Sequence, residues 1–155
     1  MSAYAAAGTD PADRVVAFLN TLDVEDDVDA LGSVDEYVAW SGQDQTRTTL
    51  ARARRLRDHL RAAAAGEATP APPLRVEVEV VVDGGAGIVG TDVVAEVAAA
   101  AATLAIEGRL GRVKICPADD CRWAFYDRSK NQSRQWCSMK VCGNRAKVRT
   151  HRERH

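Results

Sequence analysis

The cysteines of this chain fall in two pairs towards its C-terminal end. Cys116 and Cys121 are separated by four residues, Cys137 and Cys142 by another four, and the chain has no other cysteine. Two such pairs, fifteen residues apart, are typical of a zinc site, in which four thiolates surround the ion at about 2.3 Å. A closed set of four protein ligands leaves no position for water or substrate. The spacing therefore predicts one structural Zn²⁺ ion, with a redox switch or simple buried thiols as the alternative.

The residues around each pair can point its thiols inward. Pro117, Asp119 and Asp120, between the first two cysteines, favour a tight turn. Ser138 can cap a helix that begins at the next residue and so places Cys142 in the first turn. Free backbone N–H groups and the helix dipole stabilise a thiolate there. We therefore expect the second pair to lead directly into a helix.

Basic side chains follow the last cysteine at helical spacing. In a helix over residues 143–155, Arg145, Arg149 and Arg152 form a row that can follow phosphates or enter a DNA major groove. The predicted nucleic-acid contacts on this helix are Asn144, Arg145, Lys147, Arg149 and Arg152, and a second basic edge between the cysteine pairs comprises Arg128, Lys130 and Arg134. Asn144 is a residue type suited to reading adenine. The alternative is a solvated, charged tail.

The charge of the chain is divided along its length. Residues 1–108 carry 8 Lys and Arg against 18 Asp and Glu, whereas residues 109–155 carry 13 against 4, so the two parts have net charges of −10 and +9. Four thiolates and one Zn²⁺ would lower the second value to about +7. So basic a terminal segment predicts a polyanionic partner, and nucleic acid rather than a membrane.

The start of the chain and its apolar stretches predict a protein of the reduced cytoplasm. Residues 1–14 lack the basic flank and long apolar run of an export signal. The longest apolar stretch, residues 93–106, has 14 residues and contains Glu96, so it is too short for a bilayer core of about 30 Å. In a reducing compartment, clustered cysteines favour a metal over disulfides.

Apolar periodicity predicts four helices before the zinc site. They are expected over about 11–21, 33–42, 45–64 and 93–107. Arg54, Arg57 and Arg61 form a row along the third of these helices, and we expect them to make a solvated face that balances nearby acids.

The remaining segments predict loops and one hairpin. Acidic residues 23–29 are expected to form a loop, and residues 66–73, which contain three prolines, an extended linker. Alternation over residues 74–80 predicts a strand, and an Asp-Gly-Gly turn would return it to a short strand at 88–89. The fold class expected for the body is α+β, with helices around a small β-hairpin.

A second hairpin is expected between the two cysteine pairs. Trp123, Phe125 and Trp136 would pack one of its faces, and residues 127–131 would form its tip. We accordingly expect two domains, 1–108 and 109–155, of which the second needs zinc to fold.

The segment 116–152 resembles the CGNR zinc-finger family. The resemblance rests on Cys-Gly-Asn-Arg at 142–145, Trp-Ala-Phe-Tyr-Asp-Arg-Ser at 123–129 and Trp-Cys-Ser-Met at 136–139. Upstream, Val-Ala-Phe-Leu-Asn-Thr at 16–21 and the helix-hairpin-helix order are similar to the ABATE domain, described as a stress-induced transcription regulator. The resemblance implies that the four cysteines are zinc ligands in a treble-clef-like finger, and that the protein binds DNA.

The leading hypothesis is therefore a DNA-binding transcription regulator. Its body would sense an effector or pair two subunits, and zinc would orient the basic helix. The alternative is a zinc-stabilised module that binds RNA or an acidic patch on a protein. The sequence has no nucleophile paired with a base, no carboxylate dyad and no open metal site, so we do not expect an enzyme.

Overall fold

The computed structural model describes residues 2–67, 73, 75, 77–81 and 85–153, and its class is α+β, as predicted. Its helices are α1 (Ala3–Ala6), α2 (Pro11–Leu19), α3 (Val34–Ser41), α4 (Arg47–Ala64), α5 (Val93–Ile106) and α6 (Asn144–Glu153), with a 3₁₀ turn η1 (Leu110–Arg112) and a π-helical turn η2 (Met139–Gly143). Three antiparallel pairs join β1 (Leu22–Asp23) to β2 (Val28–Asp29), β3 (Glu77–Val81) to β4 (Gly85–Val89), and β5 (Val113–Ile115) to β6 (Ala124–Tyr126).

Short polar side chains set where the helices of the body begin. Asp10, Ser33 and Asp92 each accept a hydrogen bond from a backbone N–H in the first turn of α2, α3 and α5. Thr46 forms a reciprocal capping box with Thr49 at the start of α4. All four predicted helices are therefore present, with ends within about two residues of the expected ones.

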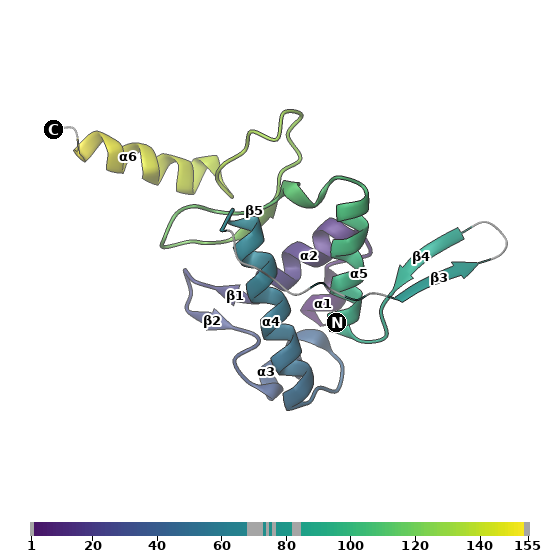
Figure 1. The fold of residues 1–155 in the computed structure, drawn as a ribbon. Helices are drawn as coiled ribbons and strands as arrows, with labels where there is room; N and C mark the ends of the chain where they lie inside the picture. The colour runs from purple at the N-terminus through teal and green to yellow at the C-terminus, as the bar shows by residue number, and fades with distance from the viewer. Residues whose placement is uncertain (1, 68–72, 74, 76, 82–84, 154–155) are drawn as a thin grey trace.

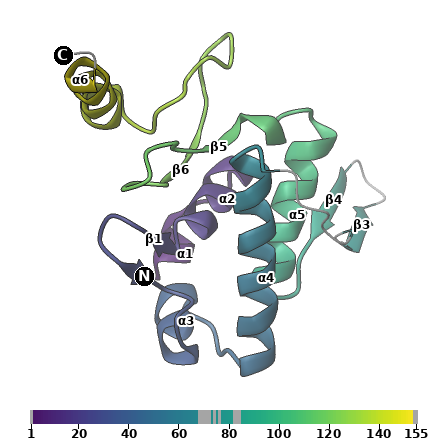
Figure 2. The same ribbon diagram turned by 60° about the vertical axis from the view of Figure 1, so that its left-hand side comes forward.

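The core forms where α2 packs against α5 and α4 (Figures 1 and 2). Phe18 and Leu19 of α2 are fully buried, as is Leu104 of α5. The β5–β6 pair packs on α2, and its residues Val113 and Ala124 belong to this same core. The hydrophobic core thus continues across residue 108, although the division into domains 1–108 and 109–155 stays a prediction.

The arginine row of α4 is not the solvated face that the sequence predicted. Arg57 is 5% exposed, and its guanidinium pairs with the Asp29 carboxylate. Arg54 donates to the backbone carbonyls of Leu31 and Gly32. Burial opposes ionisation of Asp29, but hydrogen bonds from Arg57 and a backbone N–H outweigh it and lower the pKa of Asp29. That prediction was wrong because each guanidinium finds its partner on a distant segment.

The acidic segment 23–29 contains the ends of the short β1–β2 pair as well as a turn. The β3–β4 hairpin lies beside α5 at one side of the body (Figure 1) and pairs Glu77 with Val89. The predicted Asp-Gly turn at 83–84 and most of the linker predicted over 66–73 lie outside the described residues. Among the described residues, no helix combines the length and apolar character needed to span a membrane.

Candidate metal centre and nucleic-acid interface

The four predicted ligands converge on one point. The sulfur atoms of Cys116, Cys121, Cys137 and Cys142 all lie within 4.8 Å of one another. The Sγ of Cys137 is 3.6 Å from the Sγ of Cys121 and 3.6 Å from that of Cys142. Zn–S bonds of about 2.3 Å in a tetrahedron require S···S separations of about 3.8 Å. The four thiols therefore fit, and could hold, one zinc ion.

The first cysteine pair sits on a knuckle between β5 and β6. The N–H of Cys116 donates to the carbonyl of Trp123 at 2.8 Å, and the N–H of Cys121 donates to the carbonyl of Ala118 at 3.0 Å. Arg122 completes the turn with φ of +53°. The turn predicted around Pro117 is thus present, and it brings both thiols to one side.

The second pair is held by the π-helical turn η2. The Ser138 hydroxyl caps this turn by accepting from the N–H of Val141, as predicted. The N–H of Gly143 donates to the Ser138 carbonyl at 3.0 Å, which is the wider bond of a π turn. A β-carbon on Gly143 would lie 2.9 Å from the Met139 sulfur, a contact that movement of the exposed Met139 side chain would relieve.

The environment of the thiols favours a metal that stabilises the structure. Cys116, Cys121 and Cys142 are buried, and Trp136 packs against them. Burial raises the pKa of the Cys142 thiol to about 11 in the metal-free chain. Zinc bound by all four sulfurs would neutralise the buried thiolates and cross-link the knuckle to η2. No ligand position would remain open for a substrate.

The hairpin predicted between the cysteine pairs is wrong. β6 pairs with β5, which precedes the first cysteine, and residues 127–138 form a loop. That loop is organised by Asp127, whose side chain is fully buried. Its carboxylate accepts from Lys114 Nζ at 2.7 Å, from the Ser129 N–H and hydroxyl, and from the Arg134 N–H. The Lys114 and Ser129 hydrogen bonds hold the pKa of Asp127 well below its usual range.

We expect Asp127→Asn to loosen this loop while leaving the rest of the fold in place. The amide keeps the shape of the side chain but removes the negative charge that faces Lys114, and it cannot accept all four hydrogen bonds. Hydrogen exchange at neutral pH should speed up in residues 128–136 and stay unchanged in α5. Asp44→Asn, on an exposed residue, is the control. Equal protection of the loop in both variants would contradict the role assigned to Asp127.

Two side chains of the body tie down the knuckle by its backbone. The Asn20 amide donates to the Ala124 carbonyl at 3.0 Å, and its oxygen accepts from the Ala124 N–H at 2.7 Å. Arg61 donates to the carbonyls of Leu19 and Arg122 at 2.7 and 2.8 Å. Sequence reasoning missed both roles. Asn20, the residue that follows α2, thus extends the hydrogen bonding of β6.

We expect Asn20→Ala to destabilise the chain by about 2 kcal/mol, because it leaves both the N–H and the carbonyl of buried Ala124 without partners. Asn131→Ala, which removes the same side chain from an exposed loop position, should change stability by less than about 0.5 kcal/mol. Chemical denaturation of the zinc-loaded chains measures the difference. Equal stability of the two variants would show that the Asn20 amide does not hold the knuckle.

Three of the predicted nucleic-acid contacts are engaged within the protein. Arg145 pairs with Glu25 at 2.9 Å and with Asp120 at 3.7 Å. Arg128 pairs with Asp13 at 2.9 Å and lies over the Tyr126 ring. Arg134 donates to the carbonyls of Trp136 and Cys137. These arginines thus also hold the loop and the start of α6 in position.

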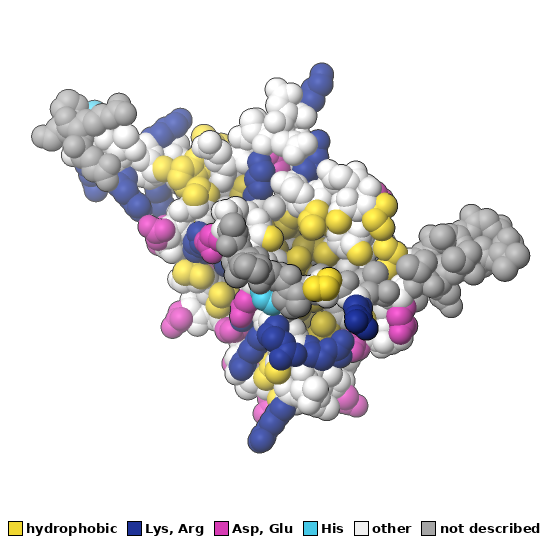
Figure 3. Space-filling view, in the orientation of Figure 1, with side chains coloured by type: hydrophobic (Ala, Val, Ile, Leu, Met, Phe, Trp, Pro, Cys, Tyr) yellow, Lys and Arg dark blue, Asp and Glu magenta, His cyan; other side chains and the backbone are white. Residues whose placement is uncertain are grey.

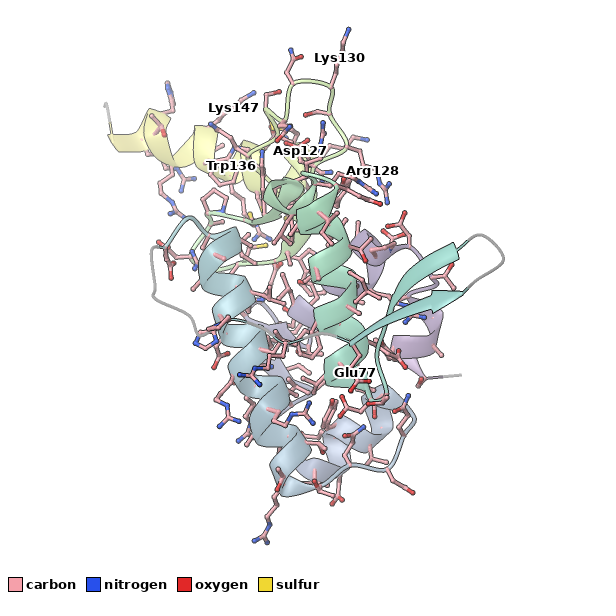
Figure 4. The ribbon with its side chains drawn as sticks, turned by 45° about the vertical axis from the view of Figure 1, so that its right-hand side comes forward. Glu77, Asp127, Arg128, Lys130, Trp136 and Lys147 are labelled. Atoms are coloured by element: carbon pink, nitrogen blue, oxygen red, sulfur yellow. The ribbon has the colours of Figure 1, made fainter. Side chains whose placement is uncertain are left out.

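The other predicted basic contacts face outward. Lys130, Lys147, Arg149 and Arg152 have no hydrogen-bonded or ion-paired partner in the described part of the chain. Figure 4 shows Lys130 at the outer end of the loop and Lys147 on α6. α6 projects from the body (Figures 1 and 2), and the Asn144 amide donates to the Lys140 carbonyl at 3.0 Å. One of the two amide hydrogens of Asn144 is therefore used at the start of this helix.

Comparison with known families agrees with this arrangement. The family described as "Putative stress-induced transcription regulator", ABATE, matches residues 12–117, and the family described as "CGNR zinc finger" matches residues 112–155. Neither description names an enzyme. No curated protein gives a significant match. The match to ABATE covers more than half of the chain, so the chain belongs to the ABATE family and carries a CGNR zinc finger at its C-terminal end.

Proposed function

We propose that this protein is a DNA-binding transcription regulator in which a structural zinc ion orients α6 towards the DNA backbone. The observation that supports this most directly is a set of cations on a projecting helix that have no partner among the described residues: Lys147, Arg149 and Arg152. Arg149 and Arg152 lie on one side of α6 and Lys147 lies on another, and a protein gains nothing for its own stability from such unpaired like charges. Phosphates would neutralise them.

The face of α6 suits a groove as well as a backbone. Asn144, Val148 and Arg152 follow one another along the helix with Arg145 and Arg149 beside them. Val148 is 50% exposed, and an exposed apolar side chain among cations can contact a thymine methyl group. The arginines would hold phosphates while this face meets base edges.

A single finger of this kind reads little DNA. α6 has 10 residues, which corresponds to a length of about 15 Å. We therefore propose that two chains bind together to a site of two half-sites, as helix-based readers commonly do. The body, residues 1–108, would then supply either the subunit contact or the response to an effector.

We expect the affinity for duplex DNA to fall steeply with salt. Neutralising about four phosphates, one for each of the α6 cations Lys147, Arg149 and Arg152 and one for Lys130, predicts a slope of log affinity against log salt near −3.6. Fluorescence anisotropy with a labelled duplex measures this slope, and selection from a random DNA pool measures the preferred sequence. Absence of DNA binding at low salt would contradict the proposal.

The exposed apolar residues on and beside α6 favour one alternative. Met139 is 52% exposed and Val141 44% exposed, so an acidic and apolar patch on a partner protein could also cover this face. The same titration with single-stranded RNA and with duplex DNA separates the two. Tighter binding of RNA than of DNA, or binding of neither nucleic acid, would favour the alternative, a zinc-stabilised module that binds RNA or an acidic patch on a protein.

A further inference from the structure

A large apolar groove is lined both by helices of the body and by residues of the segment 110–136. It has a volume of about 910 Å³, which is in the range of small-molecule sites. Its floor includes Leu19 of α2 and Val113 of β5, and Ala64 of α4 lines it at one side. Figure 3 shows apolar side chains gathered between α4 and α5 on this face. The fold has not filled this space with its own described side chains.

The charge around the groove has one sign. Lys114 and Arg134 are the only charged residues that line it among the described residues, and none of the described lining residues is acidic. The Lys114 ammonium group donates hydrogen bonds to the Asp127 carboxylate and to the carbonyls of Gln132 and Arg134. Arg134 differs, because its Nε and Nη2 donate to backbone carbonyls and its guanidinium lies over the Phe125 ring at 4.8 Å, while Nη1 has no hydrogen-bonded partner in the described part of the chain.

We propose that this groove binds a small amphipathic carboxylic acid, with its apolar body against Leu19, Ala64 and Val113 and its carboxylate on the Nη1 face of Arg134. An apolar groove alone would bind apolar molecules with little selectivity. A guanidinium that pairs with no carboxylate among the described residues adds selectivity for an anion, because a carboxylate accepts charge-assisted hydrogen bonds from it. Two neighbouring carbonyls already hold the guanidinium in position.

The ligand would act on the finger through short connections. Arg134, Gln135 and Trp136 form one wall of the groove and directly precede the predicted zinc ligand Cys137. Trp136 also packs against the cysteine cluster (Figure 4). A ligand that fills the groove adds contacts to this wall, and so it stabilises the loop that carries Cys137. The groove is therefore placed to report an effector to the finger.

The test uses the zinc-loaded full chain and calorimetric titration with two carboxylates of different shape, octanoate and 2-naphthoate. Their neutral counterparts are 1-octanol and 2-naphthylmethanol. We expect at least one carboxylate to bind at one site per chain, at least about tenfold more tightly than its alcohol. Arg134→Gln should remove this preference and Arg134→Lys should keep most of it. Arg55→Gln, an exposed arginine on α4 outside the groove, should bind like the parent chain.

A second variant locates the site. Ala64→Trp places a large side chain in the groove without touching Arg134 or the cysteines, and it should abolish binding while the zinc content stays at one ion per chain. Three results would each overturn the proposal: no saturable binding of either carboxylate, equal affinity for acid and alcohol, or binding that Ala64→Trp leaves intact. None of these readouts depends on DNA, so failure of the groove proposal and failure of the DNA proposal are distinguishable.

Discussion

Removal of zinc is expected to unfold the body together with the finger. Val113, Ile115 and Ala124, on the two strands that flank the knuckle, are part of the hydrophobic core formed by α2, α4 and α5. A structural zinc site contributes on the order of 10 kcal/mol, which is as large as the whole stability of a typical domain. Cys121→Ser, or chelation of the parent chain, should therefore abolish the cooperative thermal transition or lower its midpoint by more than about 10 °C.

The experiment distinguishes unfolding of the body and the finger as one cooperative unit from unfolding of the two parts independently. Calorimetry of the zinc-loaded chain should give a single transition, and circular dichroism after chelation should show loss of helix well beyond the ten residues of α6. Met139→Ala is the control, because it removes an exposed sulfur-containing side chain beside the site and should leave the zinc content unchanged. If a chelated chain kept the helical signal of the body, the core would not depend on the knuckle in the way that Ala124 and Val113 indicate.

The features that were predictable from sequence are those set by neighbours along the chain. A cap such as Asp10, Ser33 or Asp92 acts within the next three residues, so it can be recognised without knowing the fold. The cysteine spacing works in the same way, because each pair needs only a local turn to direct its thiols. Ser138 also combines these features, since it is both a cap and the residue after Cys137.

The features that could not be predicted depend on distant partners. β6 follows the first cysteine pair, and nothing within it specifies whether it pairs forwards or backwards; the burial of Val113 and Ile115 against the body favours β5. Asn20 is 104 residues from Ala124, with which it exchanges two hydrogen bonds. A polar residue at a helix end usually caps that helix, so its sequence context gives no sign of the second role.

The burial and pairing of charged side chains were the features hardest to predict from sequence. Arg57 of α4 and Arg149 of α6 are the same residue type on helices with similar patterns, yet the first is buried on Asp29 and the second has no partner in the described part of the chain. The number of cations can be read from a sequence, but which of them pair with a carboxylate in the folded chain cannot. Of the eight predicted nucleic-acid contacts, four are cations without a partner in the described part of the chain, three are arginines engaged within the protein, and one is Asn144.

The distinction between paired and unpaired cations leads to a prediction about the affinity for DNA. We expect the double variant Arg149→Gln/Arg152→Gln to weaken binding to duplex DNA about 30-fold, because each lost phosphate contact costs about 1 kcal/mol. The salt slope should also become shallower by about 1.8, since two fewer counterions are released. Anisotropy titrations at several salt concentrations measure both quantities on one sample.

The matched control changes two arginines of α4 in the same way. Arg47 and Arg55 are exposed residues of the body, so Arg47→Gln/Arg55→Gln alters net charge equally but lies away from α6. A general attraction between DNA and positive charge would weaken binding alike in both double variants and would count against a contact made by α6. A loss confined to the α6 variant, with zinc content and thermal midpoint unchanged, would instead locate the phosphate contacts on the helix that follows Cys142. Among the described residues, Arg149 and Arg152 are cations without a partner on a helix that comes directly after the cysteine cluster.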